Sequence, residues 1–164
     1  MAFTRGPAML VCLALCWSTC RLAAGEEKEL FNGKDLTNFT EGKGKWKVVD
    51  GAIVNELDPA AASRLETTAS FGDFEMTCKL MYENTRNGEL QIHSYGQVFA
   101  LHLEPGAWVE IKVVAKGADV KLTVAGQAVE FDKNDGKPDQ KEGVIGFCAP
   151  KGGTLKLKEV KIKK

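Results

Sequence analysis

The sequence lacks an excess of charge, a long apolar run and any extended helical period. Lys and Arg together number 22, as do Asp and Glu, so the formal net charge of the 164 residues is zero. No run of basic residues is long enough to indicate nucleic-acid binding. The apolar run at 8–17, of about ten residues, is too short to span a bilayer. We therefore expect no nucleic-acid partner and no membrane span, and the length fits one domain with its own core.

The first 25 residues have the features of a signal peptide. Arg5 supplies a positive start, residues 8–17 supply the apolar segment, and the small residues at 23–25 precede the charged Glu26. We expect cleavage after residue 24 or 25, which leaves 26–164 as the mature domain. A secreted or periplasmic location is the expected consequence.

Cysteine is scarce beyond this leader, where only Cys78 and Cys148 remain. Two cysteines in an exported protein suggest a disulfide. Strand alternation argues against one, because Cys78 shares its face with Leu80 while Cys148 lies on the opposite face from Phe147. The interpretation favoured by the pattern is two free thiols, with Cys78 in the core.

Beyond the leader, apolar and polar residues alternate with a period of two, and turn signals such as Asp50-Gly51 separate the runs. Many short strands without helical periodicity predict an all-β sandwich or barrel. One short helical turn is expected at 58–62, and a bulge near Lys158-Glu159 would reconcile the two parities of the last strand. The predicted strands are 46–50, 52–57, 64–68, 72–83, 88–94, 97–103, 107–116, 118–125, 127–131, 142–149 and 154–163.

Several segments occur in the order typical of one known family. They are LFNGKDL at 30–36, VVDGAIV at 48–54, LETTASFGDFEMTCKL at 65–80, PGAWVEIKVVAKGADVKLTVAGQAV at 105–129, EGVIGF at 142–147 and LKLKEVKIK at 155–163. In these segments the chain resembles the 3-keto-disaccharide hydrolase domain family, as a short and divergent member. The resemblance implies a concanavalin A-like (LamG-like) jelly roll, an all-β antiparallel sandwich of two sheets. It also implies a carbohydrate partner.

The hairpin at 87–103 contains both histidines of the chain. A two-residue turn at Tyr95-Gly96 would place Glu89 directly opposite His102, with Cβ atoms about 4.5–5.5 Å apart. The same register would gather Glu89, Gln91, His93 and His102 on one polar face. Such a face can be the ordinary wet side of a sheet, whereas the resemblance implies a sugar-binding face.

The family's reaction, as the resemblance implies it, begins with removal of the C2 proton of a 3-keto glycoside, after which the enolate expels the aglycone and water adds. His93 or His102 is the candidate base, with Glu89 orienting or charging His102. Gln91, Trp46 and Trp108 are the candidate substrate-binding residues. A divalent metal held by both histidines and Glu89 is a further hypothesis, because two His and one carboxylate form a recognised ligand set.

The sequence departs from the family pattern beside this hairpin. FALHLEPGAW runs directly from strand to turn, where typical members carry a long loop that would wall the pocket. His93 stands where the family motif has Arg. Two classes therefore stay open: an exported enzyme acting on oxidised glycosides, and a non-catalytic carbohydrate-binding or structural module that has lost the pocket loop.

The strand-parity argument makes a direct prediction about the thiols. In residues 26–164, titration under denaturing and non-reducing conditions should find two reactive thiols, because Cys78 and Cys148 lie on different faces. Finding none would contradict the argument.

Overall fold

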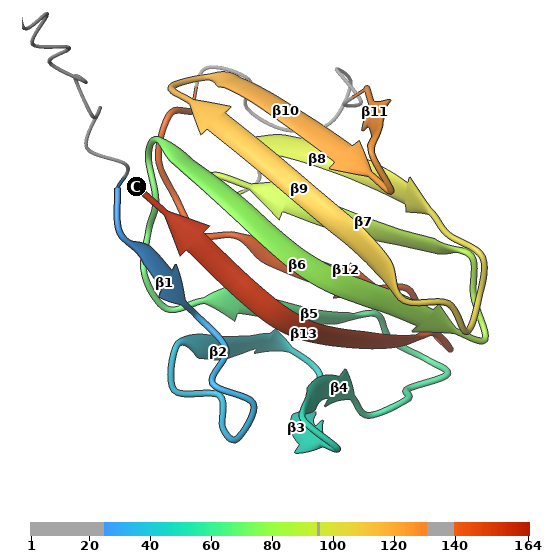
Figure 1. Cartoon of the computed structure of the whole chain (residues 1–164). Helices are drawn as coiled ribbons and strands as arrows, with labels where there is room; N and C mark the ends of the chain where they lie inside the picture. Colours follow the sequence, from blue (N-terminus) through green and yellow to red (C-terminus); the bar gives the residue numbers. More distant parts are fainter. Residues whose placement is uncertain (1–24, 95, 131–139) are drawn as a thin grey trace, which may run out of the picture.

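The computed structural model describes residues 25–94, 96–130 and 140–164, which form two antiparallel sheets packed face to face (Figure 1). Within these ranges there is no helix, and hence none long and apolar enough to cross a membrane. The expected all-β, two-sheet antiparallel sandwich is confirmed.

The larger sheet has eight strands. They are β1 (Glu27–Glu29), β3 (Trp46–Val49), β4 (Ala52–Asn55), β6 (Phe74–Glu83), β9 (Val109–Lys116), β10 (Asp119–Val124), β11 (Gln127–Val129) and β13 (Thr154–Lys163). Their order is β11-β10-β9-β6-β13-β4-β3, and β1 pairs with β13. The smaller sheet has the order β2-β5-β12-β7-β8, from β2 (Phe39–Lys43), β5 (Ser63–Thr67), β12 (Gly146–Ala149), β7 (Asn87–Ile92) and β8 (Gln97–His102).

Each predicted strand has a counterpart, but β1 and β2 were not predicted. Every residue of β1 is exposed and only Phe39 of β2 is buried, so neither segment shows the alternation that reveals a strand. The helical turn expected at 58–62 is wrong. The Asp58 carboxylate does accept from the amides of Ala60 at 2.8 Å and Ala61 at 3.2 Å, as an N-cap would. The Asp58 carbonyl, however, accepts from the Gly152 amide at 2.8 Å, and no helix follows.

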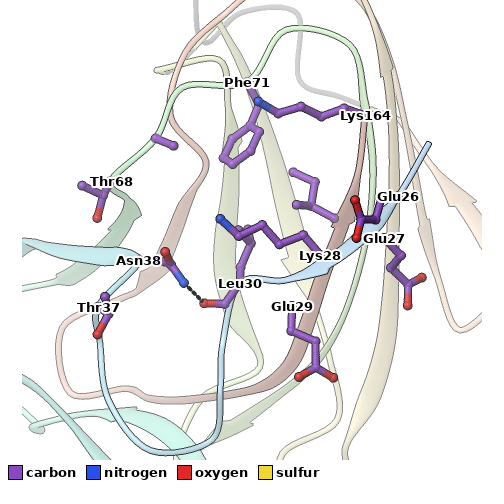
Figure 2. Close-up of a pocket in the computed structure, with 12 residues that line it drawn as sticks. Glu26, Glu27, Lys28, Glu29, Leu30, Thr37, Asn38, Thr68, Phe71 and Lys164 are labelled. Atoms are coloured by element: carbon purple, nitrogen blue, oxygen red, sulfur yellow. Dashed lines mark hydrogen bonds between the residues drawn. The ribbon is translucent and has the colours of Figure 1, made fainter.

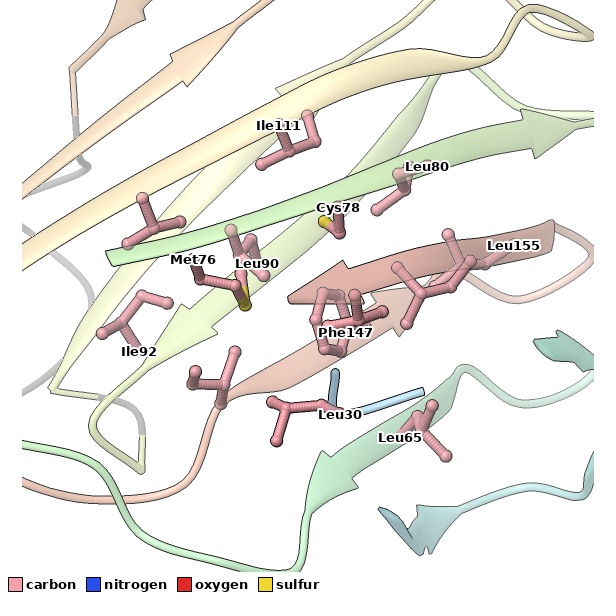
Figure 3. Packing of buried hydrophobic residues seen from close by; sticks show 14 of the residues in the cluster. Leu30, Leu65, Met76, Cys78, Leu80, Leu90, Ile92, Ile111, Phe147 and Leu155 are labelled. Atoms are coloured by element: carbon pink, nitrogen blue, oxygen red, sulfur yellow. The ribbon is translucent and has the colours of Figure 1, made fainter. Parts of the chain in front are cut away.

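The core lies between the sheets, and Figure 3 shows side chains of both meeting there. Met76, Cys78 and Leu80 of β6 face Leu90 and Phe147 of the smaller sheet, and all five are at most 2% exposed. Burying a side chain of this size contributes about 1.5–3 kcal/mol. The face of each strand that meets the core is thereby fixed, and with it the face that meets solvent.

The predicted bulge in β13 is confirmed. The register against β6 shifts between Lys158 and Lys161, and Glu159 has a positive φ of 52°. Leu157 and Val160 are both fully buried despite their opposite parities. A hydrogen bond from Lys79, at 2.7 Å, holds the pKa of the Glu159 carboxyl below its ordinary value.

Both described cysteines are free, as the alternation predicts. Cys78 is in the core, where burial raises the pKa of its thiol to about 12. Cys148 lies on the outer face of β12, in register with Arg64 and Glu89.

Tyr82 joins the two sheets. It is fully buried on β6, and its hydroxyl donates to the backbone oxygen of Cys148 at 3.0 Å. Its ring lies against Gly88 of β7, where a Cβ would sit 1.8 Å from the hydroxyl oxygen and 2.0 Å from Cζ. Gly88 is therefore required by packing, since its φ is not positive.

Replacing Gly88 with Ala should lower the free energy of unfolding by about 1–3 kcal/mol, because the added methyl group overpacks the core against Tyr82. Urea unfolding measures this change. Gly72→Ala is the matched control, because its Cβ would meet only Lys141 O at 3.7 Å. Equal stability of the two variants would contradict the packing account.

Candidate functional site

The outer face of the smaller sheet carries two adjacent rows of side chains, defined by backbone register. One row contains Lys43, Arg64, Cys148, Glu89 and Ala100, and the next contains Thr40, Glu66, Gly146, Gln91 and Val98. Charged and amide side chains thus meet over the middle strands β5, β12 and β7. The rows lie back to back with the core residues Leu65, Phe147 and Leu90, which alternate with them along the same strands.

Two polar pairs flank Gly146 on this face. Arg64 Nη2 lies 2.9 Å from Glu66 Oε1, and Gln91 Nε2 donates to Glu89 Oε2 at 3.2 Å. A Cβ on Gly146 would sit 3.3 Å from Gln91 Oε1 and 3.8 Å from Arg64 Cδ. The absence of a side chain at Gly146 therefore gives both long side chains the room to lean toward each other.

A groove crosses this face beside the polar pairs. It consists of two adjoining cavities of about 250 and 230 Å³ that share Ala62, Glu89 and Cys148. Arg64 borders the first cavity and His102 borders the second. Glu89 thus lies at the junction, with a permanent positive charge on one side and an imidazole on the other.

Cys148 sits at this junction but does not supply a nucleophile. Burial raises the pKa of its thiol to about 12, and the nearby Glu89 carboxylate acts in the same direction. A neutral thiol is a poor nucleophile and a weak hydrogen-bond donor. The reactive groups of the groove are therefore the carboxylate, the guanidinium and the imidazole.

The register predicted for the hairpin is wrong by two residues. Glu89 lies opposite Ala100, and His102 lies opposite Asn87. β7 ends at Ile92 and β8 begins at Gln97, so the connection is longer than the expected two-residue turn; Tyr95 lies outside the described residues. Ser94 helps to fix this loop, because its amide donates to Val144 O at 2.9 Å and its hydroxyl accepts from Val144 N at 3.0 Å.

The two-residue shift keeps Glu89, Gln91 and His102 on the predicted face, since side chains repeat every second residue. Glu89 and His102 now stand diagonally, at a typical spacing of about 7–8 Å. They form no ion pair with each other in the described part of the chain, although both line the second cavity. The prediction that Glu89 and His102 lie directly opposite each other is wrong, but both side chains line the same groove.

His93 lies off this face, contrary to the prediction. Its side chain is fully buried, with Nδ1 3.2 Å from Gln140 O and Nε2 3.1 Å from Gly72 O. The ring also stacks edge to face with Phe74, at 6.0 Å between centroids. His93 therefore ties the hairpin loop to two other segments and has no access to the groove.

The metal hypothesis fails on the same geometry. In residues 25–94, 96–130 and 140–164, no three side chains of His, Cys, Asp or Glu are grouped so that they could hold a metal ion. Glu89 and His102 line the groove, but His93 does not join them.

Neither predicted tryptophan is on the groove. Trp46 is 6% exposed in the core, and its indole N–H donates to Lys43 O at 3.2 Å. Trp108, 37% exposed, precedes β9 of the larger sheet. The Lys158 ammonium lies 4.1 Å from its ring centroid and covers one face of the ring. The groove instead contains Arg64, which is paired with Glu66, and the sequence analysis selected neither residue.

A family model confirms the resemblance drawn from the sequence. Residues 26–103 match the model of the 3-keto-alpha-glucoside-1,2-lyase-like domain, a range that includes Arg64, Glu89 and His102. The resembling segments after residue 103 lie outside this match. No curated protein sequence matches the chain significantly.

Solved structures confirm the jelly-roll fold. Two structures of a "putative glycosyl hydrolase" from Parabacteroides distasonis superpose with TM-scores of 0.66 and 0.69, at 19% and 14% identity. Each covers 85% of this chain, and the alignments span 93% and 99% of those chains. The carbohydrate binding module CBM66 from Bacillus subtilis gives a TM-score of 0.62 at 14% identity, covering 78% of this chain and 96% of its own.

The two histidines should differ in their effect on stability. His93→Phe should lower the free energy of unfolding by about 1–3 kcal/mol, because whichever of Gly72 O and Gln140 O accepts from the ring N–H loses its donor. His102→Phe, on the exposed face of β8, should change it by less than about 0.5 kcal/mol. Urea unfolding compares them, and equal losses would contradict the structural role of His93.

Proposed function

We propose that the groove binds a 3-keto glycoside and that Glu89 removes its C2 proton, because residues 26–103 match the model of the 3-keto-alpha-glucoside-1,2-lyase-like domain. The observation that carries this proposal is the position of Glu89 at the junction of the two cavities. A glycoside with its oxidised ring in one cavity and its aglycone in the other would place the reacting carbons over this carboxylate.

The ketone at C3 acidifies the C2 proton, so a carboxylate can serve as the base once the enolate is stabilised. Glu89 is exposed at its position on β7, and its bond from Gln91 orients the carboxylate. Proton transfer to Glu89 leaves the electron pair on the enolate. The enolate then expels the C1 substituent, and the resulting double bond is hydrated by water.

Arg64 is the group placed to stabilise the enolate oxygen. A guanidinium remains charged at any working pH and offers several N–H donors in one plane. Its 2.9 Å pairing with Glu66 holds it at the wall of the first cavity. Fixed positive charge beside developing negative charge is an effective source of transition-state stabilisation.

His102 lines the second cavity, on the side where the aglycone would lie. An imidazole at that position can act as a general acid and donate a proton to the departing oxygen. With this proton, the aglycone leaves with a hydroxyl group. Glu89 would thus act on the C2 proton, and His102 on the oxygen that leaves C1.

A second candidate is a non-catalytic saccharide-binding module. The groove is formed on an open sheet face, and the missing loop after Leu103 leaves it shallow. The fold likeness to a carbohydrate binding module supports this alternative. Either function fits export, and we also propose that residues 1–25 are cleaved as a signal peptide.

Aglycone release from a 3-keto glucoside with a chromogenic aglycone tests the proposal. Glu89→Gln should lower kcat by at least about 100-fold, because it removes the base and keeps the shape of the side chain. Glu104→Gln is the control, because this carboxylate is paired with Arg86 on an exposed surface and lines neither cavity of the groove.

Calorimetric titration with the same 3-keto glucoside separates the two candidate functions. Turnover that Glu89→Gln leaves intact would overturn the assignment of the base. Binding without turnover by the unaltered protein would favour the binding module, and absence of both would contradict the use of this groove for sugars.

A further inference from the structure

A larger cavity, of about 880 Å³, lies beneath β1 at one end of the sandwich. Its walls come from β1, from Thr37 and Asn38 before β2, and from Thr68 and Ala69 after β5 (Figure 2). It has no lining residue in common with the groove. Its volume falls within the range of about 300–1,000 Å³ that is typical of small-molecule sites.

The floor of this cavity is part of the hydrophobic core. Leu30, Phe71 and Ile162 lie there and are between 3% and 5% exposed. The Asn38 amide donates to Leu30 O at 2.8 Å and so joins the end of β1 to the opposite wall. The floor offers apolar contact and few polar groups, which suits a hydrocarbon or aromatic body better than a hydroxyl-rich sugar.

Charge alternates along β1. Figure 2 shows Lys28 reaching over the cavity while Glu27 and Glu29 leave the strand on its other side. Glu27 is paired there with Lys161 at 3.3 Å. From the end of β13, Lys164 also reaches over the cavity, with its ammonium 5.1 Å from the Phe71 ring centroid.

Neither Lys28 nor Lys164 forms an ion pair with a carboxylate among the described residues. Glu26 is the acidic residue of the lining that shares the strand parity of Lys28. The lining holds two lysines and three glutamates, of which Glu27 is paired with Lys161, and the two lysines are the charged groups that Figure 2 shows reaching over the apolar floor. A single carboxylate between the ammonium groups of Lys28 and Lys164 would pair with both of them.

We propose that this cavity binds an amphipathic monocarboxylate. The apolar body would lie on Leu30, Phe71 and Ile162, and the carboxylate would lie between the ammonium groups of Lys28 and Lys164. Lys164 covers Phe71 through a cation–π contact. The ligand would replace that contact with an ion pair and with apolar packing on the ring.

Calorimetric titration of the full chain with decanoate and with 2-naphthoate tests the proposal. We expect saturable binding of at least one of the two acids. Tighter binding of decanoate would indicate that the cavity prefers an acyl chain, and tighter binding of 2-naphthoate that it prefers an aromatic ring. Lys28→Met and Lys164→Met should each weaken carboxylate binding by roughly fivefold. The neutral amide of the tighter ligand should bind more weakly and be insensitive to both changes. Lys47→Met, on an exposed position of β3, is the control.

Ala69→Trp fills the cavity from its exposed rim and should abolish binding of both acids without lowering the melting temperature. The proposal is overturned if neither acid binds saturably to the unaltered protein. It is also overturned if binding survives both Ala69→Trp and the double lysine replacement. None of these variants changes a residue of the groove, so the outcomes are independent of the glycoside assay.

Discussion

Burial of one face of each strand between the two sheets determines what the other face can do. Leu65, Phe147 and Leu90 form a continuous inner row across β5, β12 and β7, and each is fully buried. Because side chains alternate, the residues on either side of them must face outward. Arg64 and Glu89 are brought into one row by this constraint, although 25 positions separate them in the chain.

The fold was largely predictable because alternation is a local property. It located the strands of the core, the free thiols and the bulge at Glu159. It failed at β1 and β2, whose residues are nearly all exposed and leave no apolar pattern. Because β1 forms a wall of the 880 Å³ cavity, that cavity could not be predicted from the sequence either.

The groove was predictable only in part. The face shared by Glu89, Gln91 and His102 follows from parity, which a shift of two residues preserves. The position of His93 depends on contacts with Gly72 and Gln140, which no local pattern contains. Arg64 and Glu66 alternate correctly within β5, but nothing in the sequence shows that β5 and β7 both pair with β12.

Two separate surfaces follow from the same sandwich. The outer face of the smaller sheet offers a polar groove, and the open end beneath β1 offers an apolar floor with two lysines reaching over it. Amide chemical shifts recorded by NMR while a 3-keto glucoside is added test the central claim most directly. The account predicts shifts centred on Arg64, Glu89 and Cys148, with the larger sheet around Trp108 unchanged. Shifts centred on Trp108, with the groove unaffected, would contradict it.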